Sequence, residues 1–144
     1  MREIGGFFEL ELNQGKVYHE NTMAFNSGAN ALHFFLQNSE YQTVYIPYFT
    51  CDVVVNVAKQ LNLEVVFYKL DKLFRPKIDF SKLNESTVLI YNNYFGICGD
   101  LIEEVSNKTK HLIIDAAQAF YYKPKKGQFS FSSARKFFGV PDGG

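Results

Sequence analysis

The chain has 144 residues, the usual size of one domain, and 47% hydrophobic and 17% aromatic content excludes a disordered chain. The formal net charge is zero, which argues against nucleic acid or an anionic membrane as the partner, and no apolar run reaches the ~18 residues of a membrane span. Zero net charge does not argue against a small anionic ligand that is held by local groups.

The two cysteines, Cys51 and Cys98, lie far apart and form no C-x-x-C pattern. We expect both to be reduced and mostly buried. No histidine clusters with a cysteine at zinc spacing, and the N-terminus lacks a basic and then apolar leader pattern. These features predict a cytoplasmic protein without a metal site.

Residues 1–21 look irregular, and a helix is expected to begin at Ser27, a good N-cap followed by apolar residues at helical spacing. Further helices are predicted at 51–61 and 100–107. β-rich apolar runs predict strands at 43–48, at 63–70, within 86–96 up to Asn92 and Asn93, within 110–120 up to Asp115, and at 127–133. Residues 71–84 read as a loop with a turn at Pro76, and 121–127 read as a polar turn.

Apolar strands that alternate with helices predict an α/β fold: one domain over 1–144, with a mostly parallel sheet and helices on both faces. Ligands of such sheets bind at the carboxyl ends of the strands. The segments at those ends are Tyr48–Cys51, Asn92–Gly96, Asp115–Gln118 and Ser130–Lys136.

Two positions in the sequence suit charged groups, one an anion and the other a cation. The helix start at Ser27, Gly28, Ala29 and Asn30 offers free N–H groups and a positive dipole end, which suit a phosphate, although an ordinary capped helix shows the same pattern. Asp115 directly follows an apolar strand, where a carboxylate needs a cationic ring nitrogen, a metal or a helix-capping role. Gln118 either points to the same place or lies on the surface.

Lys136 stands between small hydroxyl residues and glycines. A partly buried lysine becomes a nucleophilic amine, and a neighbouring Arg135 would disfavour its protonation. A surface lysine in a basic turn is the alternative. Taken together, a phosphate cradle, an acid and an amine predict a pyridoxal phosphate site, in which the lysine bonds to the cofactor aldehyde.

The order of five motifs also resembles the DegT/DnrJ/EryC1/StrS sugar aminotransferases, which are fold-type-I pyridoxal phosphate enzymes. The motifs are SGANAL, IPYFTCD, NNYFGICGD, LIIDAAQAF and FSFSSARKFFGVPDGG, and the similarity runs from about Gly5 to Gly144. The resemblance implies transfer of an amino group, often from glutamate, to a keto sugar attached to a nucleotide. Relatives that dehydrate sugars carry histidine in place of Lys136, so the aminotransferase branch is favoured.

The resemblance also implies roles for single residues. Lys136 would bond to the cofactor and carry protons, Asp115 would pair with the ring nitrogen, and Gln118 would lie near the ring hydroxyl. Gly28, Ala29 and Asn30 would hold the phosphate at the helix start. Ser133 would join them from the lysine loop, with Ser130 as an alternative because the spacing to Lys136 is unusual. Cys51 matches the position that stacks on the ring.

Three departures from the family pattern stand out. Many members have threonine at Ala29 and an aromatic residue at Cys51, so stacking here would need Tyr48, Phe49 or Tyr94. Family enzymes are also considerably longer. The resemblance thus implies the N-terminal portion of a fold-type-I large domain, truncated and without the small domain.

Two readings of the function follow. The first is a pyridoxal-phosphate-dependent sugar aminotransferase. The second is a non-catalytic remnant of the family that folds and self-associates, with or without the cofactor. A metal- or phosphate-binding α/β domain that uses Asp115 is disfavoured, because no G-x-x-x-x-G-K-[ST] loop accompanies it. An incomplete sheet would leave an open edge and bare apolar faces, so we expect a homodimer or a higher species.

Overall fold

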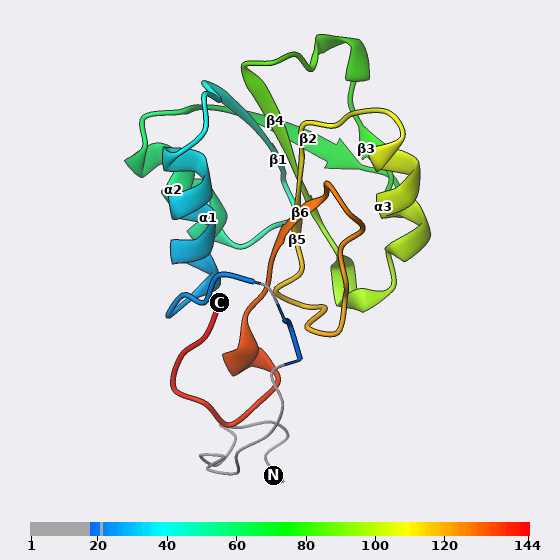
Figure 1. The fold of residues 1–144 in the computed structure, drawn as a ribbon. Coiled ribbons are helices and arrows are strands. Elements are labelled where there is room, and N and C mark those ends of the chain that lie inside the picture. The colour runs from blue at the N-terminus through cyan, green and yellow to red at the C-terminus, as the bar shows by residue number, and fades with distance from the viewer. Residues whose placement is uncertain (1–17, 21) are drawn as a thin grey trace, which may run out of the picture.

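The computed structural model describes residues 18–20 and 22–144, so most of the segment 1–21 expected to be irregular lies outside the described residues. One α/β layer structure is seen, with a sheet between helices (Figure 1). The helices are α1 (Gly28–Gln37), α2 (Asp52–Gln60) and α3 (Gly99–Ser106). The strands are β1 (Thr43–Pro47), β2 (Glu64–Leu70), β3 (Pro76–Lys77), β4 (Thr87–Asn92), β5 (Leu112–Asp115) and β6 (Phe129–Phe131). Short 3-10 turns are η1 (Phe80–Lys82), η2 (Tyr94–Gly96) and η3 (Ala134–Lys136).

The sheet has the strand order β3-β2-β1-β4-β5-β6. Every neighbouring pair from β2 to β6 is parallel, whereas β3 pairs antiparallel with β2 at the edge. Two of the parallel pairs are joined by crossovers that carry a helix, α2 between β1 and β2 and α3 between β4 and β5, while α1 precedes β1. The mostly parallel sheet with helices on both faces is therefore confirmed.

The predicted loop at 71–84 is wrong in part, because it contains β3 and η1. The carboxylate of Asp71 accepts hydrogen bonds from the amides of Leu73 and Arg75, at 2.7 and 2.9 Å. These bonds turn the chain back, so that Pro76 and Lys77 pair with the end of β2. A strand of two residues is too short to show a period-two pattern in the sequence.

The helices cover opposite faces of the sheet, with α1 and α2 on one side and α3 on the other (Figure 1). Strand β4 shows how both faces are filled. Val88 and Ile90 pack with α1 and α2, while Leu89 and Tyr91 pack with α3, and all four are fully buried. This two-sided burial accounts for the continuous apolar runs in the sequence. Among the described residues no helix is both long and apolar enough to cross a membrane.

Helix α1 begins against the end of β6. Ser27 caps it, because its hydroxyl accepts the amide of Asn30 at 3.2 Å. Gly28 is buried, and a side chain there would place its Cβ 2.8 Å from the backbone oxygen of Ser132. The close approach of these two segments therefore requires a glycine.

We expect Gly28→Ala to destabilise the chain by about 1–3 kcal/mol, because the clash is with backbone and cannot be relieved by a rotamer change. Gly99→Ala is the matched control, since nothing lies within 4 Å of its added Cβ. The control should stay within about 0.5 kcal/mol of the wild type. Urea unfolding measures both. Equal stability of the two variants would show that the close approach at Gly28 is absent.

Candidate functional site

The polar ends of three neighbouring strands meet at one edge of the sheet. In the parallel register Asn92 pairs with Asp115, and Asp115 pairs with Phe131. The ladder continues past the strand ends, because the amide of Asn93 donates to the Asp115 carbonyl and the amide of Ala116 donates to the Phe131 carbonyl, both at 2.8 Å. The segments expected to share an edge therefore do so.

Asp115 is a buried acid, with only 7% of the residue exposed. One carboxylate oxygen accepts the amide of Ala117 at 2.8 Å. Burial raises the pKa of the Asp115 carboxyl above its usual range, while the Ala117 hydrogen bond and the positive charge of Lys136 act against that rise. The carboxylate is thus short of a cationic partner, and Lys136 is close enough to act on it.

Lys136 ends η3, the turn that follows β6. Its amide donates to the Ser133 carbonyl at 3.3 Å, and its side chain is exposed. Arg135 is also exposed, but it is not among the charges that shift the pKa of Asp115. Of the two basic residues of the turn, Lys136 is therefore the one whose charge lowers the pKa of the Asp115 carboxyl. In the described part of the chain Lys136 forms no ion pair.

The start of α1 offers two backbone donors. The amide of Asn30 is bonded to Ser27, and its side chain donates to Asn26 at 2.5 Å, whereas the amides of Gly28 and Ala29 donate no hydrogen bond within residues 18–20 and 22–144. A helix start with two N–H groups that donate no hydrogen bond suits an anion, and Gly144 lies against the first of them, since a Cβ on Gly144 would meet the Gly28 nitrogen. Asn30 holds the turn that precedes the helix, and its contact to a phosphate stays a prediction.

The lysine turn is tied to the helix start by the last residues of the chain, which lie beside α1 (Figure 1). The amide of Gly143 donates to Asn26 at 3.0 Å, and Gly144 exchanges two hydrogen bonds with Phe25. The carbonyl of Gly143 also accepts the amide of Ala134, the first residue of η3, at 3.1 Å. Gly143 has a φ of 126°, which favours glycine. The hydrogen bonds of residues 143–144 therefore fix η3 relative to the start of α1.

Ser133 and Ser130 remain the two hydroxyl candidates. Ser133 is 6% exposed, and its hydroxyl makes no capping bond to η3. Ser130 lies in β6 opposite Ile114 and is half-buried. Ser133 is one residue past the Ser132 carbonyl that touches Gly28, so it stands nearer in the chain to the helix start.

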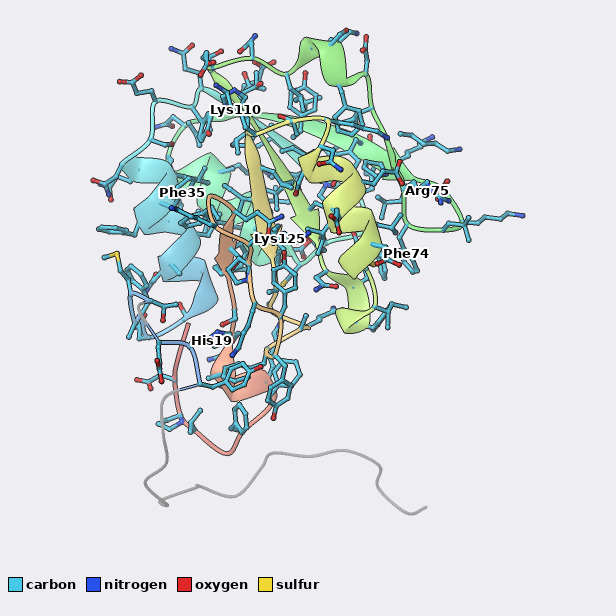
Figure 2. The ribbon with its side chains drawn as sticks, turned by 45° about the vertical axis from the view of Figure 1, so that its right-hand side comes forward. His19, Phe35, Phe74, Arg75, Lys110 and Lys125 are labelled. Atoms are coloured by element: carbon cyan, nitrogen blue, oxygen red, sulfur yellow. The ribbon has the colours of Figure 1, made fainter. Side chains whose placement is uncertain are left out.

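Gln118 is exposed, and its side-chain oxygen accepts the amide of Phe95 at 3.2 Å. It borders a cavity of about 330 Å³ that is lined mainly by aromatic residues and lies against η3. The lining residues are Asn93, Phe95, Gly96, Gly99, Gln118, Ala119, Phe120, Tyr121, Tyr122 and Phe137. His19, labelled in Figure 2, supports this wall, since its ring lies 4.8 Å from that of Phe120.

Cys51 is exposed at the start of α2, and its thiol makes no capping bond. The expectation that both cysteines are mostly buried is therefore right for Cys98 and wrong for Cys51. The reason is that Cys51 follows the open end of β1, whereas Cys98 faces the core beneath α3. Of the neighbouring aromatic rings, Phe49 is 59% exposed and stacks in parallel on buried Tyr94 at 5.3 Å.

Thr50 is a site neighbour that sequence reasoning missed. Its hydroxyl accepts from the side-chain amide of Asn92 at 3.0 Å, which ties the end of β1 to the end of β4. The available signal was the position of Thr50 just past a strand end, next to Cys51.

No protein-family model matches the sequence, and no curated protein matches it. Solved structures do match. Tyrosine aminotransferase from Leishmania infantum has a TM-score of 0.65 at 13% identity, over 85% of this chain and 37% of that one. The aminotransferase TlmJ from Streptoalloteichus hindustanus has 0.60 at 20% identity, over 83% and 38%. The sugar aminotransferase CalS13 from Micromonospora echinospora has 0.53 at 18% identity, over 67% and 31%.

The chain has an aminotransferase fold. This confirms the fold that the resemblance to the DegT/DnrJ/EryC1/StrS enzymes implies. The chain spans between 31% and 38% of the length of these three structures. In this chain Asp115 ends β5 and Lys136 follows β6, so both lie past the carboxyl ends of parallel strands, where ligands of α/β proteins bind.

Burial of Asp115 makes a prediction about stability and pH. The unfolded chain releases this proton at a lower pH than the folded chain does, so stability falls as pH rises between the two pKa values. Asp115→Asn removes that loss and keeps an oxygen for the Ala117 amide. We expect the variant to be more stable than the wild type at pH 7, with the gain vanishing below the ordinary aspartate pKa. Between the unfolded and folded pKa values, the difference in unfolding free energy between the variant and the wild type changes by up to about 1.4 kcal/mol per pH unit.

Urea unfolding at a series of pH values measures this difference. Asp79→Asn is the matched control, because hydrogen bonds from Ser81 lower the pKa of the exposed Asp79 carboxyl. The control should therefore show no gain at pH 7. If Asp115→Asn and the wild type had the same pH profile, the carboxyl would not be desolvated.

Proposed function

We propose that this chain is part of a pyridoxal-phosphate-dependent aminotransferase whose amino acceptor is a keto sugar attached to a nucleotide. The observation that supports this most is that the buried acid Asp115 and the lysine turn follow neighbouring strands at one end of the sheet, where the charge of Lys136 acts on the acid. The aminotransferase fold of the neighbours, one of them a sugar aminotransferase by name, supports the reaction class.

The residues present fit the cofactor. A phosphate needs donors, and the free amides of Gly28 and Ala29 supply them at a helix start. A pyridinium nitrogen needs a buried carboxylate, and Asp115 lacks a full cationic partner. An aldehyde needs an amine, and Lys136 carries one that no described carboxylate binds.

Each residue then has a role. Gly28, Ala29 and Ser133 hold the phosphate, and Asn30 keeps the helix start in place through Asn26. Ser130 is the alternative hydroxyl. Pyridoxal phosphate supplies an electron sink when it is bound, and the protein supplies orientation and proton transfer.

The chemistry of this chain centres on one acid and one amine. Asp115 keeps the ring nitrogen protonated, because a buried carboxylate stabilises a cation beside it. Lys136 would hold the cofactor through its aldehyde, and its Nζ would be the group that carries the proton of the transfer step. Gln118 would lie near the ring hydroxyl; without a ligand its side-chain oxygen accepts the Phe95 amide.

Stacking on the ring is assigned to the segment that follows β1. Cys51 stands at the stacking position that the resemblance implies, and its thiol is exposed. Phe49 supplements it with an exposed aromatic face that is backed by Tyr94. A thiol covers less of a planar ring than an aromatic side chain does, so we expect weaker cofactor binding than an aromatic residue at position 51 would give.

The finer points are also part of the proposal: glutamate as an amino donor, a homodimer, a cytoplasmic location and a domain that is the N-terminal portion of a large domain. The alternative is a family remnant that folds and self-associates without turnover. Among residues 18–20 and 22–144, β6 pairs with β5 alone, and an outer edge without a further strand favours self-association in both cases. Formation of a keto acid from the donor separates the two functions.

We expect borohydride reduction with pyridoxal phosphate to attach the cofactor to the peptide that holds Lys136. Lys136→Ala should lose more than nine tenths of this adduct, because the amine that faces Asp115 is gone. Peptide mass spectrometry and the absorbance spectrum of the complex measure it. Arg135→Ala is the control and should keep the adduct, since Arg135 does not act on the acid.

A full adduct in Lys136→Ala would contradict the proposed amine. Incubation of the wild type with glutamate then tests turnover. Keto acid formation that Lys136→Ala loses supports the aminotransferase. An adduct without keto acid supports the remnant.

A further inference from the structure

A second cavity, of about 450 Å³, lies on the β2–β3 side of the sheet, whereas Asp115 ends β5 on the other side. It is lined by aromatic and basic residues of β1, β2, β3 and η1, together with the residues next to them. The lining residues are Tyr45, Tyr48, Val66, Phe67, Tyr68, Lys69, Lys77, Ile78, Asp79 and Lys82, and we call the cavity the edge notch. Of these residues, the aminotransferase proposal draws on Tyr48 alone, as an alternative to Phe49 for stacking on the ring.

The lysines of the edge notch are arranged unfavourably for a chain without a ligand. Lys69 and Lys77 stand directly opposite each other in the antiparallel pairing of β2 with β3. Like charges in that position repel. Lys82 adds a third positive charge from η1. Within the described ranges none of the three forms an ion pair.

The acidic groups nearby do not neutralise this charge. Asp79 is the one carboxylate in the lining of the notch, and it is bound to the hydroxyl and amide of Ser81 at 2.6 and 3.1 Å. Asp71, whose charge reaches Lys77, is occupied by two backbone amides of its own turn. Three ammonium groups against the carboxylates of Asp79 and Asp71 leave a surplus of one positive charge. Because none of the three lysines is held in an ion pair within the described residues, all three remain available to an anion.

The same notch offers an aromatic platform. Tyr48 and Phe67 stack at 5.1 Å with their rings 20° apart, and they are 64% and 41% exposed. Stacked rings that stay exposed beside lysines present a π-face to a planar ligand. The neighbouring guanidinium of Arg75 is not available, since it pairs with Glu104 of α3 at 3.6 Å, on the side seen in Figure 2.

We propose that the edge notch binds a nucleoside diphosphate, with the diphosphate on Lys69, Lys77 and Lys82 and the base on the Tyr48–Phe67 pair. The volume suits a ligand of this size, since small-molecule sites span roughly 300–1,000 Å³. An acidic peptide that adds a strand to β2 fits less well, because residues 78–82 line the far side of the notch.

This site is separate from the proposed cofactor site. Lys69 and Lys77 lie on β2 and β3, and four strand spacings separate β2 from β6, which is about 19 Å across the sheet. Tyr48 lies nearer, because it follows β1. A ligand in the notch therefore does not reach Lys136 through its diphosphate. A nucleotide bound here is a second ligand, and the notch is occupied independently of pyridoxal phosphate.

Calorimetric titration of the full chain with ADP, UDP and pyrophosphate tests the site. We expect saturable binding of ADP or UDP, weakened about tenfold by Lys77→Gln and by Lys69→Gln, since each removes one charge-assisted contact. Tyr48→Ala should weaken the nucleotide about tenfold and pyrophosphate less than twofold, because it removes stacking alone. Lys72→Gln is the control, since Lys72 is exposed on the same connection but does not line the notch, and it should change binding less than twofold.

A second readout needs no ligand. Lys77→Gln removes the cross-strand repulsion, so its melting temperature in the absence of anions should rise above that of the wild type, while Lys72→Gln leaves it unchanged. Borohydride trapping of pyridoxal phosphate should be the same in Lys77→Gln and the wild type. A loss of trapping there would overturn the separateness of the two sites.

Three results would overturn the proposal. The first is the absence of saturable binding of any of the three probes. The second is equal weakening by Lys77→Gln and Lys72→Gln, which means a diffuse charge effect. The third is a ligand preference that refutes the role of the aromatic pair. Pyrophosphate would then bind as tightly as ADP and UDP, or an acidic peptide would bind tightly in place of the nucleotides.

Discussion

The parallel pairing of β4, β5 and β6 determines where the polar side chains of the candidate site lie. Because these strands run the same way, their carboxyl ends reach one edge, and the register sets Asp115 between Asn92 and Phe131. The chain must then leave β6 at that same edge, which puts η3 and Lys136 beside the acid. A change of register by one residue would turn Asp115 to the other face of the sheet.

The low polarity around Asp115 determines how that arrangement can act chemically. A carboxylate that is 7% exposed and bonded to one amide is costly in its charged form, so it favours any cation placed next to it. In the chain alone, Lys136 supplies part of that charge from an exposed position. The tight contact of Gly28 with Ser132 brings the donors at the start of α1 to the same place. The positions of the acid, the lysine turn and the start of α1 are thus consequences of backbone packing.

Much of the fold and of the candidate site could be predicted from the sequence, because helices and strands carry patterns that repeat over several residues. Continuous apolar runs predicted β4 and β5, and the residue that ends β5 was placed correctly at Asp115. The serine cap predicted the start of α1. A resemblance of motifs assigned Lys136 and not Arg135, and in the structure Lys136 is the one that acts on the acid.

What could not be read depends on contacts between segments that carry no periodic signal. The two-residue strand β3 follows from the turn at Asp71, and the opposition of Lys69 and Lys77 follows from β3. The exposure of Cys51 and the bond from Asn92 to Thr50 depend on how two strand ends meet. The same holds for the commitment of the Asn30 amide to Ser27, which leaves other amides for an anion.

The proximity of Lys136 to the buried acid is the central claim, and a direct titration of the Asp115 carboxyl by NMR tests it. The positive charge of Lys136 holds the pKa of that carboxyl down, so Lys136→Met should raise it further, whereas Arg135→Met should leave it where it is. The same Asp115 titration curve in the wild type and in Lys136→Met would mean that the amine does not face the acid. The site, and the aminotransferase proposal with it, would then be contradicted.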